Sequence, residues 1–136
     1  MTRVCLDSNV LVAAFVARGL CADLLRLVLT EHELVVPEVV RQEVRAVLVG
    51  KLKASREALS TVEAVLEECE LTPPTDTPCP IPVRDPDDER VLADTLSAGV
   101  EILATGDQDL LAVAEESPIR ILSPRAFLAL TRGGTH

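Results

Sequence analysis

Two aspartates in this sequence each follow a short apolar run. Asp7 comes directly after residues 4–6, Val-Cys-Leu, and Asp107 follows closely on residues 102–104, Ile-Leu-Ala. These runs predict buried strands, and the carboxyl ends of parallel strands meet at the edge of the sheet where ligands bind. We therefore expect both carboxylates at one binding edge, each followed by a helix whose free backbone amides could help to bind an anion.

Two further acids fall where the helical period predicts burial. Glu43 shares its stripe with Val40 and Val44, and a carboxylate among valines is costly in free energy unless another group pairs with it. Asp88 precedes the apolar residues 91–92 by one helical turn, so it heads the inward stripe of its own helix. The chain thus directs four carboxylates inward or to a strand end.

Such a set of carboxylates predicts a metal site. Four acids in one pocket would raise one another's pKa unless a cation neutralised them. All the candidate ligand atoms are oxygens and no histidine stands at ligand spacing, which favours Mg²⁺ or Mn²⁺ over zinc.

Each acid also has a simpler interpretation. Asp7 and Asp107 could cap the helices that follow them, and Glu43 could pair with a nearby arginine. Asp88 lies in an acidic first turn, residues 85–89, which would stabilise any helix through its dipole. The coincidence of all four acids in this order on one sheet favours a shared site.

Short strands alternate with helices along the chain. Strands are predicted at residues 4–6, 34–36, 102–104 and 119–122. Helices are predicted at residues 10–16, 21–29, 37–49, 53–69, 87–98, 108–114 and 124–131. Residues 72–84 hold five prolines and predict a loop or crossover. This order predicts one domain over residues 1–136, an α/β fold in which a three-layer α/β/α sandwich encloses a central parallel sheet.

The composition limits which partners the protein can bind. Its 22 acidic and 13 basic side chains give a formal net charge of −9, which excludes nonspecific coating of nucleic acid by a basic surface. Trp and Tyr are absent and Phe occurs twice, so the protein has almost no aromatic side chains on which bases could stack. Any nucleic-acid contact would be made mainly through phosphates.

A local basic patch is predicted on the helices that carry or follow Glu43. Five of the basic residues lie there close together in sequence: Arg41, Arg45, Lys51, Lys53 and Arg56. The alternative interpretation is a solvated helix face whose cations pair with neighbouring glutamates. Arg84 and Arg90, beside the acidic turn, are further candidates for phosphate contacts.

Cysteine usage and hydropathy favour a cytoplasmic protein. The cysteines form no C-x-x-C pair, which indicates free thiols in a reducing compartment: Cys5, Cys21, Cys69 and Cys79. Apolar stretches are broken well before the roughly 18 residues that a membrane span needs, so export and membrane insertion are disfavoured.

Four segments, taken in order, carry a resemblance to a known family. They are Leu6-Asp7-Ser8-Asn9, Arg41-Gln42-Glu43-Val44, residues 85–93 (DPDDERVLA) and residues 105–110 (TGDQDL). Together they resemble the PIN domain, most closely the branch of toxin components related to the VapC toxins of toxin–antitoxin systems. The resemblance spans nearly the whole chain. It implies a metal-dependent ribonuclease that uses Mg²⁺ or Mn²⁺, with RNA as substrate, an antitoxin protein as partner and a homodimer as assembly.

The family's functional positions carry over residue by residue. Its four acidic positions match Asp7, Glu43, Asp88 and Asp107, and an additional acid of this branch matches Asp109. The polar positions that steady the acids match Asn9 and Thr105. The acidic motif alone would also allow Asp85 or Asp87 to occupy the position assigned to Asp88. Asp88 is preferred because it stands three and four residues before the apolar pair 91–92.

The implied reaction is hydrolysis of a phosphodiester bond. One or two divalent ions would polarise the phosphate and lower the pKa of a bound water, so that hydroxide attacks in line. Asp7 and Asp107, at strand ends, would be the firmest ligands. Glu43 and Asp88 would act through water or orient the nucleophile.

Two other classes of protein fit parts of the sequence. A phosphatase of the haloacid-dehalogenase type needs D-x-D after the first strand, where Asn9 stands instead of the second aspartate, and a receiver domain needs a lysine after a late strand, where none occurs. A PIN-fold interaction module that has lost activity is disfavoured because no acidic position is substituted. Metal binding without RNA cleavage would be its sign.

Overall fold

A parallel sheet organises the chain in this computed structural model, which describes residues 1–133, so that residues 134–136 lie outside the described part. Within it, five parallel strands pair in the order β3-β2-β1-β4-β5. The strands are β1 Arg3–Leu6, β2 Glu33–Pro37, β3 Glu70–Thr72, β4 Ile102–Ala104 and β5 Arg120–Leu122. In the central strand β1, Val4 pairs with Leu34 on one side and with Ile102 on the other.

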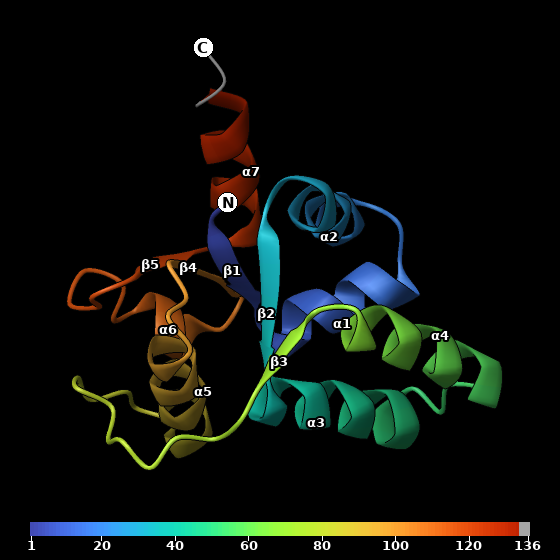
Figure 1. Cartoon of the computed structure of the whole chain (residues 1–136), viewed down its shortest axis with the longest axis horizontal. Coiled ribbons are helices and arrows are strands. Elements are labelled where there is room, and N and C mark those ends of the chain that lie inside the picture. Colours follow the sequence, from blue (N-terminus) through green and yellow to red (C-terminus); the bar gives the residue numbers. More distant parts are fainter. Residues whose placement is uncertain (134–136) are drawn as a thin grey trace.

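Helices cover both faces of this sheet (Figure 1). They are α1 Ser8–Val16, α2 Leu20–Glu31, α3 Glu38–Ala46, the π-helical turn η1 Val47–Lys51, α4 Arg56–Glu67, α5 Pro86–Ser97, α6 Gln108–Leu111 and α7 Pro124–Gly133. Helices α1 to α4 lie on one side of the sheet and α5 and α6 on the other, while α7 packs against α2. The predicted α/β/α sandwich with a central parallel sheet is confirmed. In residues 1–133, no helix combines the length and hydrophobicity that crossing a bilayer requires.

Buried apolar runs account for the positions of the inner strands. Val4, Cys5 and Leu6 of β1 and the three residues of β4 are all buried, as expected for strands covered by helices on both faces. Helix α3 adds Val40 and Val44 to the same core, so that its opposite face remains available to solvent.

The short edge strand β3 is absent from the sequence prediction, which ended a helix at residue 69 and began a loop at residue 72. Glu70 and Leu71 are exposed, so the segment lacks the buried apolar run of the other strands. Its extended form comes from pairing with β2, where Val35 lies opposite Glu70 and Val36 opposite Leu71. A strand that forms mainly through backbone pairing has no characteristic pattern of apolar residues, so the sequence alone does not predict it.

Three predicted helix ends also differ from the structure. The helix over 37–49 continues through Gly50 as η1 and ends at Lys51, two residues before Lys53, whose positive φ of 48° prevents a helical path. Helix α4 begins at Arg56 rather than at residue 53, because Ser55 caps it by accepting a hydrogen bond from the backbone N–H of Ala58. Helix α6 ends at Leu111 and passes into turns instead of reaching residue 114.

The proline-rich crossover between β3 and α5 is tied to α5 at two points. The backbone N–H of Thr75 donates to Oδ1 of the buried Asp94 at 3.0 Å, and that of Val83 donates to Oε2 of Glu89 at 3.2 Å. Val83 is itself buried. These contacts fix where the crossover delivers Asp85, the residue that begins the acidic turn.

Candidate functional site

Asp7 lies at the carboxyl end of β1 and is only 3% exposed. One oxygen, Oδ1, accepts the backbone N–H of Ser8 at 2.8 Å and caps α1, while Oδ2 accepts the Thr105 hydroxyl at 2.7 Å. Burial raises the pKa of Asp7 above its ordinary value, and the nearby charge of Asp107 acts in the same direction, although the hydrogen bonds oppose them. Asp7 is therefore both a helix cap and a desolvated carboxylate.

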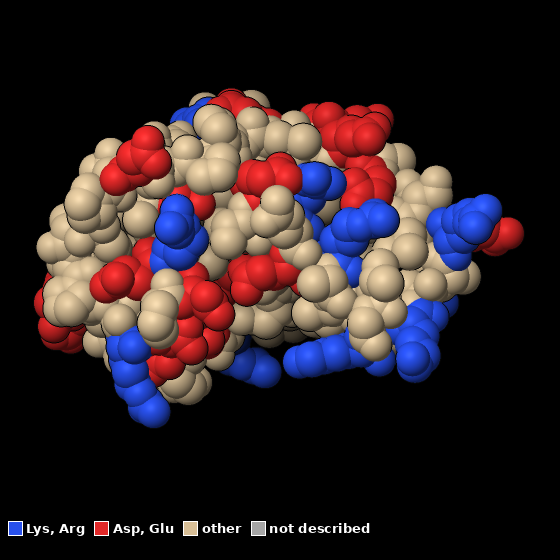
Figure 2. Space-filling view, turned by 90° about the horizontal axis from the view of Figure 1, so that it is seen from below, with Lys and Arg blue, Asp and Glu red and all other residues tan. Residues whose placement is uncertain are grey.

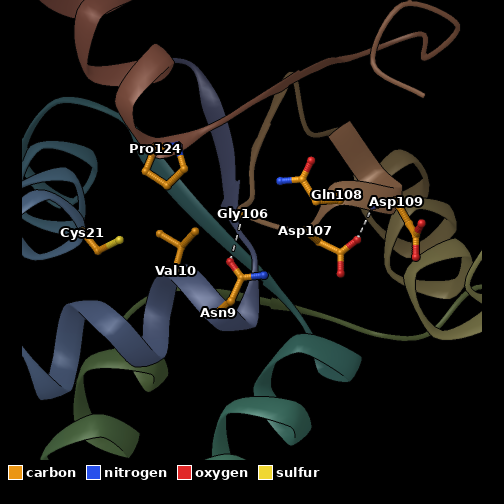
Figure 3. A pocket seen from close by; sticks show the side chains of 8 residues that line it. All are labelled: Asn9, Val10, Cys21, Gly106, Asp107, Gln108, Asp109 and Pro124. Atoms are coloured by element: carbon orange, nitrogen blue, oxygen red, sulfur yellow. Dashed lines mark hydrogen bonds between the residues drawn. The ribbon is translucent and has the colours of Figure 1, made fainter. Parts of the chain in front are cut away.

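Asn9 and Thr105 connect the ends of the two central strands. The Asn9 side chain donates through Nδ2 to Oδ2 of Asp7 at 3.4 Å and accepts the backbone N–H of Gly106 at 3.1 Å (Figure 3). The fully buried Thr105 donates its hydroxyl to Asp7 and accepts the backbone N–H of Asp107 at 3.0 Å. These contacts fix the positions of Asp7 and Asp107 relative to each other, and the supporting role of Asn9 and Thr105 in catalysis stays a prediction.

Asp107 and Asp88 approach each other from the two helices on the same side of the sheet. Asp107 caps α6, since its Oδ1 accepts the backbone N–H of Asp109 at 2.8 Å and of Leu110 at 3.2 Å. Burial raises the pKa of the Asp88 carboxyl to about 7, helped next by its hydrogen bond to Asp107 and by the surrounding negative charge. The Asp88 carboxyl therefore lies against a second acid, and a bound cation would favour its charged form.

Glu43 faces the same cluster from α3. Burial raises its pKa to about 7, and the charges of Asp7, Asp87, Asp107 and Asp85 add to that effect. Its Oε1 atom is buried and has no hydrogen-bond partner among the described residues. The arginine partner that a simpler interpretation required is not present, because Arg41 and Arg45 both pair with Glu63 of α4 instead.

The acidic turn before α5 contributes more than one carboxylate. Oxygens of Asp85, Asp88 and Asp109 lie within 4.8 Å of one another. Asp85 also caps α5 by accepting the backbone N–H of Asp87 at 2.8 Å, whereas Asp87 is exposed. The structure therefore favours Asp88 over Asp87, and it adds Asp85 beside Asp88 rather than in its place. The Asp85-Pro86 pair is a helix-start signal in the sequence, and it could have indicated that Asp85 lies at the first turn of α5, beside Asp88.

We call these acids the carboxylate cluster: Asp7, Glu43, Asp85, Asp88, Asp107 and Asp109. Among the described residues, one ion pair reaches it, from Nη1 of the exposed Arg84 to Oδ1 of Asp109 at 4.0 Å. Figure 2 looks onto this edge of the sheet and shows acidic side chains gathered on the α5 side, with Lys and Arg more frequent on the α3–α4 side. Within the described residues, a single exposed arginine therefore pairs with this cluster of six acids, which leaves most of its negative charge uncompensated.

The donor set fits a hard divalent ion. Every candidate ligand atom is a carboxylate oxygen, which Mg²⁺ and Mn²⁺ prefer, and the unpaired Oε1 of Glu43 is the kind of buried acceptor that a cation would satisfy. Burial is the main cause of the raised pKa values of Glu43 and Asp88, and neighbouring negative charges add to it; a bound cation would oppose both effects.

The predicted basic patch is only partly free. Arg41 binds Glu38 at 2.7 Å and Glu63 at 3.2 Å, and Arg45 approaches Glu63 at 3.5 Å, as in the alternative of a helix face paired with glutamates. Lys51 and Lys53 are exposed beyond the end of α3. A role for these four residues in binding RNA stays a prediction.

A cavity of about 590 Å³ opens beside the cluster. Figure 3 shows the residues that line it: Asn9, Val10, Cys21, Gly106, Asp107, Gln108, Asp109 and Pro124. Asn9, Asp107 and Asp109 belonged to the predicted site, whereas the other lining residues did not: Val10, Cys21, Gly106, Gln108 and Pro124.

Comparisons with known proteins agree with this geometry. A structure of VapBC2 from Rickettsia felis bound to a DNA fragment from their promoter contains a chain with a similar fold, at a TM-score of 0.64 and 13% sequence identity. That match covers 90% of this chain and 98% of the other. The sequence finds no match among curated proteins. The family model for the PIN domain matches residues 3–109, a span that holds the whole carboxylate cluster, and the chain therefore belongs to the PIN domain family.

Proposed function

We propose that this protein is a metal-dependent endoribonuclease that hydrolyses RNA phosphodiester bonds at the carboxylate cluster, and that it is the toxin of a toxin–antitoxin pair. The observation that carries the nuclease proposal is the set of carboxylates at the carboxyl edge of the sheet, with a buried, unpartnered oxygen on Glu43 and two pKa values raised to about 7. Membership in a family of nucleases supports it.

Asp7, Glu43, Asp88, Asp107 and Asp109 are the residues proposed to hold Mg²⁺ or Mn²⁺, with Asp85 close enough to join them. When bound, such an ion supplies a water of lowered pKa and neutralises charge that develops on the phosphate. Asp7 and Asp107 are held by Thr105 and the first turns of α1 and α6, so they offer fixed oxygens.

Glu43 and Asp88 lie on helices and have fewer fixed contacts. With pKa values near 7, their carboxyls can hold or release a proton at neutral pH, which suits the orientation of a reacting water. Substrate phosphates would meet Arg84 at the rim of the cluster, where its guanidinium is 89% exposed, and Lys51 and Lys53 on the α3 side.

The toxin assignment rests on likeness to the VapC branch and on the VapBC2 structure, which contains both members of such a pair by its name. An antitoxin partner, a homodimer and a cytoplasmic location belong to this proposal. Induced expression in a bacterial host tests it: we expect growth arrest with the unchanged protein and normal growth with Asp7→Asn at equal protein level. Equal growth of both strains would contradict the toxin assignment.

The nuclease proposal is tested with end-labelled single-stranded RNA and purified protein, in Mn²⁺ or Mg²⁺ and in chelator. We expect cleavage that needs the metal and that falls by at least about 100-fold in Asp7→Asn, since ligand loss costs no less than loss of a supporting residue. Asp23→Asn, an exposed aspartate on α2 prepared identically, should cleave normally and controls for contaminating ribonuclease. Equal cutting by all three proteins, or none by any across several RNAs, would favour an inactive binding module.

A further inference from the structure

The cavity beside the carboxylate cluster has two chemically different walls. Asn9, Gly106 and Gln108 form a polar wall at the ends of β1 and β4, while Val10, Cys21 and Pro124 form a largely apolar wall from α1, α2 and α7. In Figure 3 the Gln108 amide points toward the space between α6 and α7, and the carboxyl groups of Asp107 and Asp109 point the opposite way. The space in front of Gln108 is therefore bordered by an uncharged amide and by apolar atoms, and the carboxylates of Asp107 and Asp109 line its other side.

Such a space suits a flat, uncharged group with hydrogen bonds along its edge. A phosphate would meet repulsion from Asp107 and Asp109 there, whereas a nucleobase would place its faces against apolar atoms and its edge against an amide. The volume of about 590 Å³ leaves room for a base together with its ribose. None of the residues that line the cavity is aromatic, so shape and hydrogen bonding must supply the recognition.

The side-chain amides of Asn9 and Gln108 differ in whether they are free to bind a ligand. Asn9 is already engaged through both ends of its amide, with Asp7 and with Gly106. Gln108 is exposed, and its side chain makes no hydrogen bond to any other residue within 1–133. It also stands between Asp107 and Asp109 in the chain, so a group that it binds lies next to a phosphate at the cluster.

We propose that this cavity receives the base of a nucleotide adjacent to the cleaved phosphodiester, and that Gln108 is the specificity-determining residue that reads its edge. The inference rests on the proposed ribonuclease function. It assigns a base preference to a side chain that does not bind the metal, so loss of Gln108 should change where RNA is cut rather than whether it is cut.

The first test maps the cut sites in an RNA library of random sequence by sequencing the product ends. Gln108→Ala should lower the preference for the favoured base beside the cut by about fivefold, as expected for loss of one neutral hydrogen bond, with total cleavage retained. Gln42→Ala is the matched control, because Gln42 is the other glutamine, is exposed on α3 and contacts Glu38. An identical cut-site distribution in Gln108→Ala and the unchanged protein would overturn the proposal.

The second test does not need cleavage. Alkylation of Cys21 by iodoacetamide is followed by mass spectrometry with adenosine, guanosine, cytidine or uridine added separately, and Cys79, outside this cavity, is the internal reference. We expect at least one nucleoside to slow Cys21 alkylation, with the protection lost in Gln108→Ala. If the protein cuts no RNA, the ribonuclease proposal fails and this test alone decides: protection supports a base site, and its absence for all four nucleosides overturns it.

Discussion

Both edges of the sheet gather carboxylates, but within residues 1–133 only the amino edge has an arginine bonded closely to several of them. At the amino edge, Arg3 begins β1 and its guanidinium contacts Glu33 and Glu70, the first residues of β2 and β3. It also donates to the carbonyl of Ala98 at 2.7 Å, and its backbone N–H donates to Oε2 of Glu101 at 2.9 Å. Arg3 thereby joins four segments of the chain.

The effect on proton affinity is opposite at the two edges. The hydrogen bond from Arg3 holds the pKa of Glu70 below its ordinary value, whereas burial and like charge raise the pKa of Glu43 and Asp88 to about 7. Acids that are paired internally stabilise the fold. Acids that lack a partner must obtain a cation from solvent, which is the property expected of a binding site.

The largest expected effect comes from removing an unpaired charge. Glu43→Gln should lower metal-dependent cleavage by at least about 100-fold while raising the stability of the metal-free protein, because a buried carboxylate without a partner is lost. Cleavage of end-labelled RNA and urea unfolding in chelator measure the two effects. Glu63→Gln, which removes a carboxylate paired with Arg41 and Arg45, should lower stability instead. If both variants change stability in the same direction, the contrast between paired and unpaired acids fails.

Thr105→Val should show how far the carboxylate cluster depends on its support. The change leaves the backbone N–H of Asp107 without its acceptor and removes a donor from Asp7, so we expect about 1–3 kcal/mol less stability and roughly tenfold slower cleavage. Thr95→Val is the matched control, since Thr95 is equally buried but donates to the Val91 carbonyl within α5. Equal loss of activity in both variants would mean that Thr105 acts only through general packing.

Arg3→Met tests the amino edge. The substitution keeps much of the apolar stem and removes the charge, and we expect a loss of about 1–2 kcal/mol in urea unfolding because part of the network is exposed. The cleavage rate at saturating RNA should stay unchanged where both proteins are folded. Arg26→Met removes an exposed ion pair with Asp23, and it should lower the free energy of unfolding by well under half as much as Arg3→Met. A slower cleavage rate in Arg3→Met would break the separation of the two edges.

A further effect is expected from pH in the metal-free protein. Glu43 and Asp88 have pKa values raised from 4.5 and 3.8 to about 7, so their stabilising contribution is full at low pH and is lost as pH rises through about 7. The urea midpoint in chelator should therefore be lower at pH 8 than at pH 5, and Mn²⁺ should restore more of it at pH 8. The Glu43→Gln, Asp88→Asn double variant should flatten the curve. An unchanged slope in that variant would assign the pH dependence to other groups.

The sequence was sufficient for features that depend on local pattern. Buried runs marked β1 and β4, and the possible caps Asp7 and Asp107 marked the starts of the helices that follow, so both acids could be placed at strand ends from the sequence. The capping and site interpretations of these acids are compatible, because one carboxylate oxygen caps the helix and the other remains for a second partner.

Features that depend on long-range partners were out of reach. Whether Glu43 had a cation depended on Arg41 and Arg45, and the approach of α4 brings Glu63 to them instead. Strand β3 depends on β2, and the cavity needs α2 and α7 beside α6. The local hydrophobic pattern cannot indicate any of these contacts, because each joins segments that are far apart in the sequence and become neighbours only in the fold.

The parallel sheet has a consequence for the order in which the protein is made. Asp7 precedes Thr105 by 98 residues, and β1 cannot pair with β4 until that later segment has left the ribosome. A nascent chain released early would carry Asp7 and Glu43 but not the hydroxyl, the backbone turn or the carboxylates that complete the cluster. Assembly of the proposed cutting centre therefore waits for the segment that carries Thr105, Asp107 and Asp109.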